Sequence, residues 1–243
     1  MKLYPAIDLM GGACVRLSQG AFESKKVYNE DPKAVLAGFA AAGAQAVHLV
    51  DLDGAKDPAR RQTALLRTLA GSCPLEVQAG GGVRSVADVE ALLGAGVTRV
   101  VVGTAAVENP GLGQAMFERF GGSRITLALD AFVDEAGAAA VATRGWKEKS
   151  RLTVQELITA FLPVGLERVL CTDISKDGML AGPGLTLYKR LAAEFPRLEL
   201  QASGGVRSLD DLLALKAIPV HSAVVGKALY EGRLDLAQAV RAC

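Results

Sequence analysis

A chain of 243 residues, of which 50% are apolar, can bury one large hydrophobic core, so a single domain is the expected arrangement. The 27 Lys and Arg residues nearly balance the 26 Asp and Glu residues, which argues against nucleic acid as a partner because polyanions are bound through an excess of basic side chains. No apolar run approaches the roughly 20 residues that span a bilayer, so no membrane partner is expected.

The cysteines and the first residues indicate the compartment. Cys14, Cys73, Cys171 and Cys243 lie far apart and form none of the close pairs of metal sites or redox motifs, so we interpret them as reduced thiols. The first apolar stretch is interrupted at Asp8, long before the core of a signal peptide could form. We therefore expect a cytoplasmic protein.

Eight short apolar or β-branched runs alternate with segments of helical spacing. This alternation is typical of βαβ units with a parallel sheet. Strands are predicted over residues 3–8, 45–51, 75–79, 97–102, 124–130, 167–173, 198–202 and 221–226. Helices are predicted over residues 32–42, 59–70, 85–94, 110–120, 153–162, 184–194, 208–216 and 233–241.

The sequence contains an internal repeat of half its length. Residues 78–107 align without a gap with residues 201–230, at an offset of 123. A period this long indicates two (βα)4 half-barrels, approximately 1–122 and 123–243, that close into one (β/α)8 TIM barrel with an internal two-fold repeat. The alternative is a doubly wound open sheet, which rarely carries a duplication of this kind.

Glycine-rich turns follow the third and seventh predicted strands, and further glycine turns follow the fourth and eighth. Glycine lets backbone N–H groups approach an anion closely, and barrels often bind phosphate at these loops. The alternative is that the glycines only make tight turns, but their repetition favours phosphate binding. The candidate binding residues are Gly81, Gly82, Arg84, Gly103, Thr104, Ser203, Gly204, Gly205, Gly226 and Lys227.

Two carboxylates related by the repeat end apolar strands. An offset of 122 pairs Asp8 with Asp130, and TIM barrels present catalytic groups at these strand ends. The repeat places the pair on opposite sides of the barrel axis, which suits a general acid and a general base. A strand-end Asp can instead cap a helix or form an ion pair. Two phosphate sites half a barrel apart further imply a small-molecule substrate with a phosphate at each end.

More carboxylates follow the second and sixth strands, but they predict no metal site. The chain has two histidines, and its carboxylates follow no ligand motif. An ion held by Asp51 and Asp53 is the alternative, and we interpret His48 as a residue that orders its strand.

A long loop from Val133 to Lys147 carries the one tryptophan. Arg144 and Trp146 in this loop are candidates for binding a flat heterocycle, with the loop as a lid, although Trp146 could instead anchor the loop.

Several motifs together resemble the histidine-biosynthesis isomerase family that acts on phosphoribosylformimino-aminoimidazole carboxamide ribotide. They cover essentially the whole chain and comprise Pro5-Ala6-Ile7-Asp8-Leu9, Val15-Arg16-Leu17, Gly20, His48-Leu-Val-Asp-Leu-Asp-Gly54, Gly80-Gly81-Gly82-Val83-Arg84, Asp173-Ile-Ser-Lys-Asp177-Gly178 and Ser203-Gly204-Gly205-Val206. The resemblance implies a general base at Asp8 and a general acid at Asp130. Thr172 and Asp177 match further active-site positions, and Asp177 is the second candidate for the acid.

The implied reaction is an Amadori rearrangement of an aminoaldose to an aminoketose, which needs proton transfers and no metal or other cofactor. Two relatives remain as alternatives: a bifunctional isomerase that also acts on phosphoribosylanthranilate, and the sister cyclase that makes imidazole glycerol phosphate. The opening Ala6-Ile7-Asp8-Leu9 favours the isomerase over the cyclase. A sugar-phosphate sensor would keep the glycine turns but has no need of opposed carboxylates. We expect a monomer.

Overall fold

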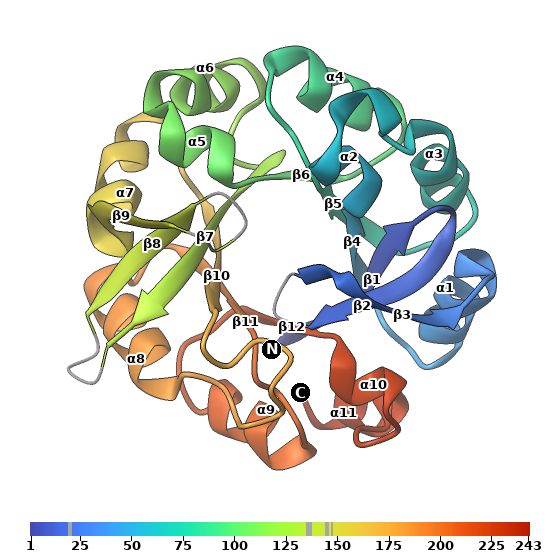
Figure 1. The fold of residues 1–243 in the computed structure, drawn as a ribbon. Coiled ribbons are helices and arrows are strands. Elements are labelled where there is room, and N and C mark those ends of the chain that lie inside the picture. Colours follow the sequence, from blue (N-terminus) through green and yellow to red (C-terminus); the bar gives the residue numbers. More distant parts are fainter. Residues whose placement is uncertain (19–20, 135–137, 144–145, 147) are drawn as a thin grey trace.

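The computed structural model describes residues 1–18, 21–134, 138–143, 146 and 148–243. In this part of the chain, eight parallel strands follow one another around a closed barrel, and the last strand pairs with the first (Figure 1). They are β1 (Lys2–Met10), β4 (Ala46–Asp51), β5 (Glu76–Gly80), β6 (Arg99–Val102), β7 (Ile125–Val133), β10 (Arg168–Asp173), β11 (Glu199–Ser203) and β12 (Ser222–Val225). The predicted TIM barrel is therefore confirmed.

Helices surround the barrel and cover its outer face (Figure 1). The main ones are α1 (Pro32–Ala41), α3 (Thr63–Gly71), α4 (Val86–Gly94), α6 (Pro110–Phe120), α7 (Val154–Phe161), α8 (Leu185–Glu194), α9 (Leu209–Lys216) and α11 (Leu236–Ala242). Shorter ones are α2 (Leu52–Lys56), η1 (Pro58–Arg60), α5 (Thr104–Glu108), η2 (Leu162–Val164) and α10 (Lys227–Tyr230). No helix of the described ranges is long and apolar enough to cross a membrane.

The predicted helix over 59–70 is broken near its start. Its first residues form η1, and α3 begins only at Thr63. The interruption has a specific cause, because Gln62 donates its backbone N–H and its side-chain amide to the Asp51 carboxylate, at 2.7 and 3.0 Å. A peptide group held by this strand-end carboxylate is not free to join the hydrogen-bond ladder of a helix.

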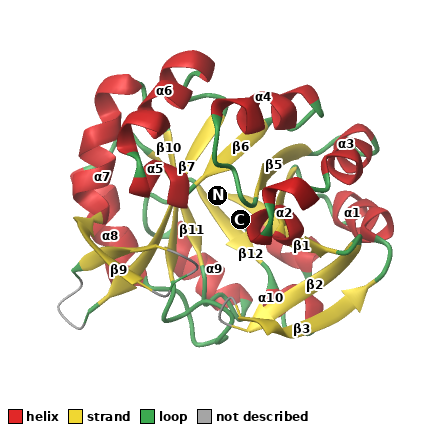
Figure 2. Ribbon diagram, turned by 45° about the horizontal axis from the view of Figure 1, so that its top comes forward, coloured by secondary structure: helices red, strands yellow, loops and turns green. Residues whose placement is uncertain are grey.

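Two hairpins extend the barrel at the ends of β1 and β7, and Figure 2 shows both at the same end of the molecule. The first comprises β2 (Ala13–Ser18) and β3 (Ala21–Asn29), which the sequence analysis did not predict. The second comprises β8 (Ala139–Thr143) and β9 (Glu148–Thr153). The prediction of one long loop from Val133 to Lys147 was therefore wrong, since this segment contains β8, which pairs antiparallel with β7 and β9.

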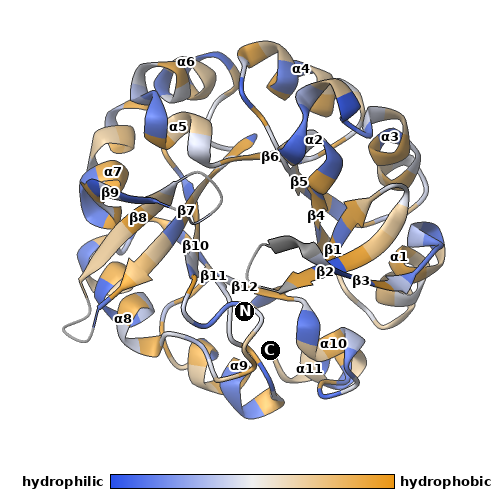
Figure 3. Ribbon diagram, viewed as in Figure 1, coloured by the Kyte–Doolittle hydropathy of each residue, from blue (hydrophilic) through white to orange (hydrophobic). Residues whose placement is uncertain are grey.

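The apolar core lies between the strands and the inner faces of the helices, while the outer helix faces are polar (Figure 3). A smaller apolar layer fills the barrel interior with Tyr4, Ala6, Ala46, Val101, Leu170 and Val224. Polar side chains share this interior: Gln78 donates from Nε2 to Gln201 Oε1 across 2.8 Å. The barrel is thus filled, and any ligand must enter above these layers, at the ends of the strands.

Candidate active site

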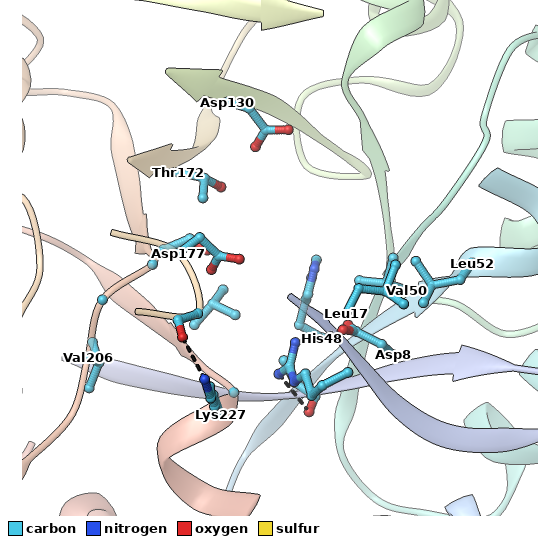
Figure 4. Close-up of a pocket in the computed structure, with 18 of the residues that line it drawn as sticks. Asp8, Leu17, His48, Val50, Leu52, Asp130, Thr172, Asp177, Val206 and Lys227 are labelled. Atoms are coloured by element: carbon cyan, nitrogen blue, oxygen red, sulfur yellow. Dashed lines mark hydrogen bonds and ion pairs between the residues drawn. The ribbon is translucent and has the colours of Figure 1, made fainter. Parts of the chain in front are cut away.

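A cavity of about 400 Å³ lies at the carboxyl ends of the barrel strands. Figure 4 shows Asp130, Thr172 and Asp177 toward one side of it and Asp8 toward the other. Many of the residues predicted from the sequence line this cavity, namely Asp8, Asp130, Thr172, Asp177, Gly81, Ser203, Gly204, Gly205, Gly226, Lys227 and Trp146. The two carboxylates that the repeat pairs therefore share one opening with both glycine-rich turns.

Asp8 forms an ion pair inside the cavity. Its Oδ2 accepts a hydrogen bond from Arg16 Nη1 at 2.8 Å, and β2 carries Arg16 into this position because its ladder pairs Asp8 with Val15. Burial raises the pKa of Asp8, and the charge and hydrogen bond of Arg16 act in the opposite direction. Asp8 is therefore a buried carboxylate whose ionised form has one cationic partner.

Asp130 accepts a hydrogen bond from a neutral donor, whereas Asp8 accepts one from the cationic side chain of Arg16. Its Oδ2 accepts from the Trp146 indole Nε1–H at 2.7 Å. Burial raises the pKa of Asp130, against the lowering effects of hydrogen bonds from Trp146 and Thr172. Within the described residues no cation pairs with Asp130, and a buried carboxyl group with a raised pKa is suited to act as a proton donor.

Asp177 lies in the turn after β10. Burial raises the pKa of Asp177 to about 6, and the charges of Asp8 and Asp130 add to the effect while Arg16 opposes it. Asp8, Asp130 and Asp177 thus share the cavity with Arg16, which ion-pairs with Asp8. Ionising one of them disfavours ionisation of the next, so Asp177 is also placed to hold a proton.

The glycine-rich turns after β5 and β11 pack tightly against the neighbouring loops. Gly82 has a φ of +68°, and an added Cβ would lie 1.9 Å from the carbonyl oxygen of Gly54. Gly205 has a φ of +84°, and its Cβ would lie 2.3 Å from the carbonyl oxygen of Gly182. These contacts require glycine for the fold itself, so the glycines by themselves do not decide between phosphate binding and turn formation.

Comparison with known proteins gives the family. The family described as histidine biosynthesis protein matches residues 2–235. This chain belongs to that family. A curated relative from Klebsiella pneumoniae subsp. pneumoniae is 48% identical over 239 residues, which cover 98% of each chain. That relative is named 1-(5-phosphoribosyl)-5-((5-phosphoribosylamino)methylideneamino)imidazole-4-carboxamide isomerase. The resemblance found in the sequence motifs is confirmed.

In this histidine biosynthesis family member, several predicted binding residues do not border the cavity. The described side chain of Arg84 turns to the neighbouring loop, where Nη2 donates to the Ala55 carbonyl oxygen at 2.9 Å. Gly82 and Gly103 follow β5 and β6, and Thr104 begins α5, but none of the three lines the cavity. Arg144 lies outside the described residues. A role of these residues in binding stays a prediction.

The sequence analysis assigned no role to Arg16, which lies in a hairpin that it did not foresee. Its guanidinium packs 5.6 Å from the centre of the Tyr230 ring and rests on the turn at Gly226, where an added Cβ would lie 1.8 Å from Nη2. Its Nε is buried without a hydrogen-bond partner in the described chain. The available signal was the position of an arginine shortly after a strand-end carboxylate, within the family motif Val15-Arg16-Leu17.

The other strand-end carboxylates are occupied by structural hydrogen bonds. Asp51 accepts from Gly54 and Gln62, and Asp53 Oδ2 accepts from the backbone N–H of Gly11 at 2.7 Å. Asp173, which the repeat pairs with Asp51, accepts from the backbone and the hydroxyl of Ser175. Within the described residues, no group of three or more His, Cys, Asp or Glu side chains is arranged to hold a metal ion. The helix-cap interpretation therefore fits Asp51, whose oxygens are used by its own fold.

Proposed function

We propose that this protein catalyses the Amadori rearrangement of phosphoribosylformimino-aminoimidazole carboxamide ribotide, an aminoaldose, to the corresponding aminoketose of histidine biosynthesis. The observation that carries the proposal is one cavity that Asp8 and Asp130 line from different sides and that both glycine-rich turns border. The relative's name adds the reaction class, because that protein is called an isomerase of a bis-phosphoribosyl imidazole carboxamide.

In this proposal Asp8 is the general base and Asp130 the general acid. The distinction rests on their partners: an arginine stabilises the ionised form of Asp8, whereas Asp130 is hydrogen-bonded by the neutral donors Trp146 and Thr172. Asp130 protonates the ring oxygen of the sugar, and the furanose opens to a Schiff base. Asp8 then removes the proton from C2′, which gives an enolamine that tautomerises to the ketone. Asp177 is the second candidate for the acid because of its raised pKa.

The substrate is a bisphosphate whose two anionic ends reach the two glycine-rich turns. The turn at Gly81 and the turn at Gly204 and Gly205 both border the cavity, so a molecule extended across it meets one turn at each end. Lys227 lies beside the second turn and donates to the Gly178 carbonyl oxygen at 2.8 Å, which leaves further ammonium protons for a phosphate. This arrangement holds the sugar between the carboxylates.

A turnover assay tests the proposed function. The purified protein is offered the imidazole carboxamide aminoaldose and, separately, phosphoribosylanthranilate, and each conversion is followed by absorbance. We expect conversion of the first without added metal or nucleotide. Conversion of both substrates would identify a bifunctional isomerase. Binding without conversion would overturn the proposal in favour of a sensor, and product formation only with ammonia would overturn it in favour of a cyclase.

A further inference from the structure

A buried polar cluster centred on Gln78 lies in the barrel interior beneath the cavity. Gln78 Nε2 is 3.0 Å from His48 Nδ1 and donates to Gln201 Oε1 at 2.8 Å. Gln78 Oε1 accepts from the Thr126 hydroxyl at 3.3 Å. All four side chains are buried, so each hydrogen bond is made away from bulk water and each lost partner would be costly.

The orientation assigned to the Gln78 amide indicates where His48 carries its proton. An amide nitrogen has two N–H donors and does not accept, so Gln78 donates one proton to Gln201 and the other to His48 Nδ1. A ring nitrogen that accepts carries no proton, and the proton of the neutral ring must then be on Nε2. Burial and the charge of Arg16 lower the pKa of His48 to about 4, which keeps the ring neutral near pH 7.

The ring of His48 also borders the cavity. The strand ladder pairs His48 with Ala6, one inward-facing position below Asp8. No hydrogen bond within the described ranges engages Nε2 of His48, so this N–H is left for a molecule in the cavity. The donor is neutral and lies on the floor of the site, whereas the glycine-rich turns lie at its rim.

The repeat shows that the cluster serves one side of the barrel only. Gln78 and Gln201 are repeat partners with the same side chain, and each pairs in register with one residue of the preceding strand. For Gln78 that residue is His48, and for Gln201 it is Leu170. Leu170 has no ring proton to place, so only Gln78 has a neighbouring imidazole whose tautomer it can fix.

We propose that Gln78 is a positioning residue which holds His48 as the Nε2–H tautomer, so that the cavity floor presents one neutral hydrogen-bond donor to an uncharged oxygen of the substrate's sugar. The substrate part of this inference rests on the proposed function. The tautomer does not, because it follows from the hydrogen bonds of the protein alone. A neutral donor suits a hydroxyl or carbonyl oxygen, since it fixes orientation without the attraction that a cation would exert on either phosphate.

The tautomer is measured directly by long-range 1H–15N NMR on uniformly 15N-labelled protein at pH 7. The chain has two histidines, so His48→Asn assigns the spectrum by removing one of the two signals. We expect an unprotonated Nδ1 and a protonated Nε2 for His48. A protonated Nδ1, or a doubly protonated ring, would overturn the proposal whether or not the protein is an isomerase.

Two matched substitutions then test the role of Gln78. Gln78→Leu removes the donor to His48, whereas Gln201→Leu disturbs the same buried pair but leaves the contact with His48. We expect Gln78→Leu to produce a mixture of His48 tautomers and a loss of about tenfold in kcat/KM, with a change below about twofold for Gln201→Leu. Equal losses in both variants, with an unchanged His48 spectrum in each, would mean that the pair only stabilises the barrel and would overturn the positioning role.

A third variant covers the case in which Gln78→Leu does not fold. Gln78→Glu keeps the shape of the side chain but offers His48 a carboxylate oxygen, which accepts and does not donate. We expect the proton of His48 to move to Nδ1 in this variant, with a lower kcat/KM. Retention of the original tautomer would overturn the proposal, since Gln78 would then not control the ring.

Discussion

Asp8 and Asp130 are repeat partners with the same side chain, but their surroundings give them different chemical properties. Arg16 donates to Asp8 at 2.8 Å, whereas the Trp146 indole donates to Asp130 at 2.7 Å. A cation favours the ionised form far more than a neutral donor does. The two halves of the barrel therefore supply one carboxylate suited to accept a proton and one suited to give it.

The proposed role of Asp8 as the base predicts the effect of Asp8→Asn. The amide keeps the size of the side chain but cannot accept the C2′ proton, so kcat should fall by about a thousandfold with little change in substrate affinity. Steady-state kinetics and calorimetric titration with substrate measure the two effects, and circular dichroism controls for folding. Turnover within about tenfold of the unmodified protein would assign the base to another group.

The raised pKa of Asp177 predicts how stability depends on pH. Its pKa is about 6 in the folded protein against 3.8 for the ordinary side chain, so between these values the folded state binds more protons than the unfolded state. The contribution of Asp177 to the free energy of unfolding is therefore fully present below pH 4 and is lost as the pH rises through 6.

Asp177→Asn should remove this dependence, because the amide stays uncharged. We expect the variant to be more stable than the unmodified protein by roughly 3 kcal/mol at pH 7 and nearly equal at pH 4. Urea unfolding at both pH values measures the difference. An equal difference at pH 4 and pH 7 would show that Asp177 is not the group that titrates.

The hairpin of β2 and β3 contributes a residue that the eight barrel strands do not supply. It reaches back over the cavity, pairs with β1 and places Arg16 against both Asp8 and the turn that follows β12. The close contact of Arg16 with Gly226 joins this hairpin to the last turn of the barrel. The geometry of Asp8 thus depends on two elements that are far apart in the sequence.

Gly226→Ala tests this dependence. The backbone at Gly226 has a φ of −120° and a ψ of −96°, outside the main regions open to L-residues, so alanine adds backbone strain to the close contact of its Cβ with Arg16. Displacement of Arg16 removes an interaction that lowers the pKa of Asp8, so the acidic limb of the pH profile of kcat/KM should move to higher pH. Gly38→Ala, in α1 with no atom within 4 Å of the added Cβ, is the control and should leave the profile unchanged. An unshifted profile in both variants would contradict the claim that Arg16 lowers the pKa of Asp8.

At the scale of the whole molecule, the proposed phosphate sites at the two glycine-rich turns predict that the substrate is selected by length. The proposal predicts that a ligand with two phosphates binds much more tightly than one with a single phosphate, because only the former reaches both turns. At a concentration of 100 times its dissociation constant, a ligand that binds only the folded state stabilises it by about 2.7 kcal/mol. Thermal unfolding with the bisphosphate product and with ribose 5-phosphate at equal concentration measures the difference. Equal shifts would contradict a two-ended clamp.

The division of the chain at residue 122 and the monomeric state stay predictions. One apolar cluster contains residues from both proposed halves, from Leu3 to Ala239. A half-barrel expressed alone would expose part of this cluster, so we expect association of two copies and not a stable monomer. Light scattering on the full chain and on residues 1–122 measures both states.

The sequence by itself determined the barrel, the family and the carboxylates of the cavity, because each shows in the residue pattern of short segments. Strand ends, alternating helical segments and a repeat of half the chain can be read without knowing any distance. The order of the strands then follows from the short connections of βαβ units. For the same reason, Asp8, Asp130 and Asp177 could be placed at one face of the barrel before any geometry was known.

Only the tertiary structure decided which partner each of these groups has. The pairing of Arg16 with Asp8, the indole of Trp146 on Asp130 and the hydrogen bond from Gln78 to His48 all join different elements. The sequence did not predict β2 and β3, or the strands of the second hairpin. β3 and β9 are largely exposed and polar, and β8 is a short run rich in alanine, so these strands carry a weak periodic signal. Burial, charge and hydrogen bonding act through space, so the pKa of a carboxyl group and the tautomer of a histidine are properties of the folded chain.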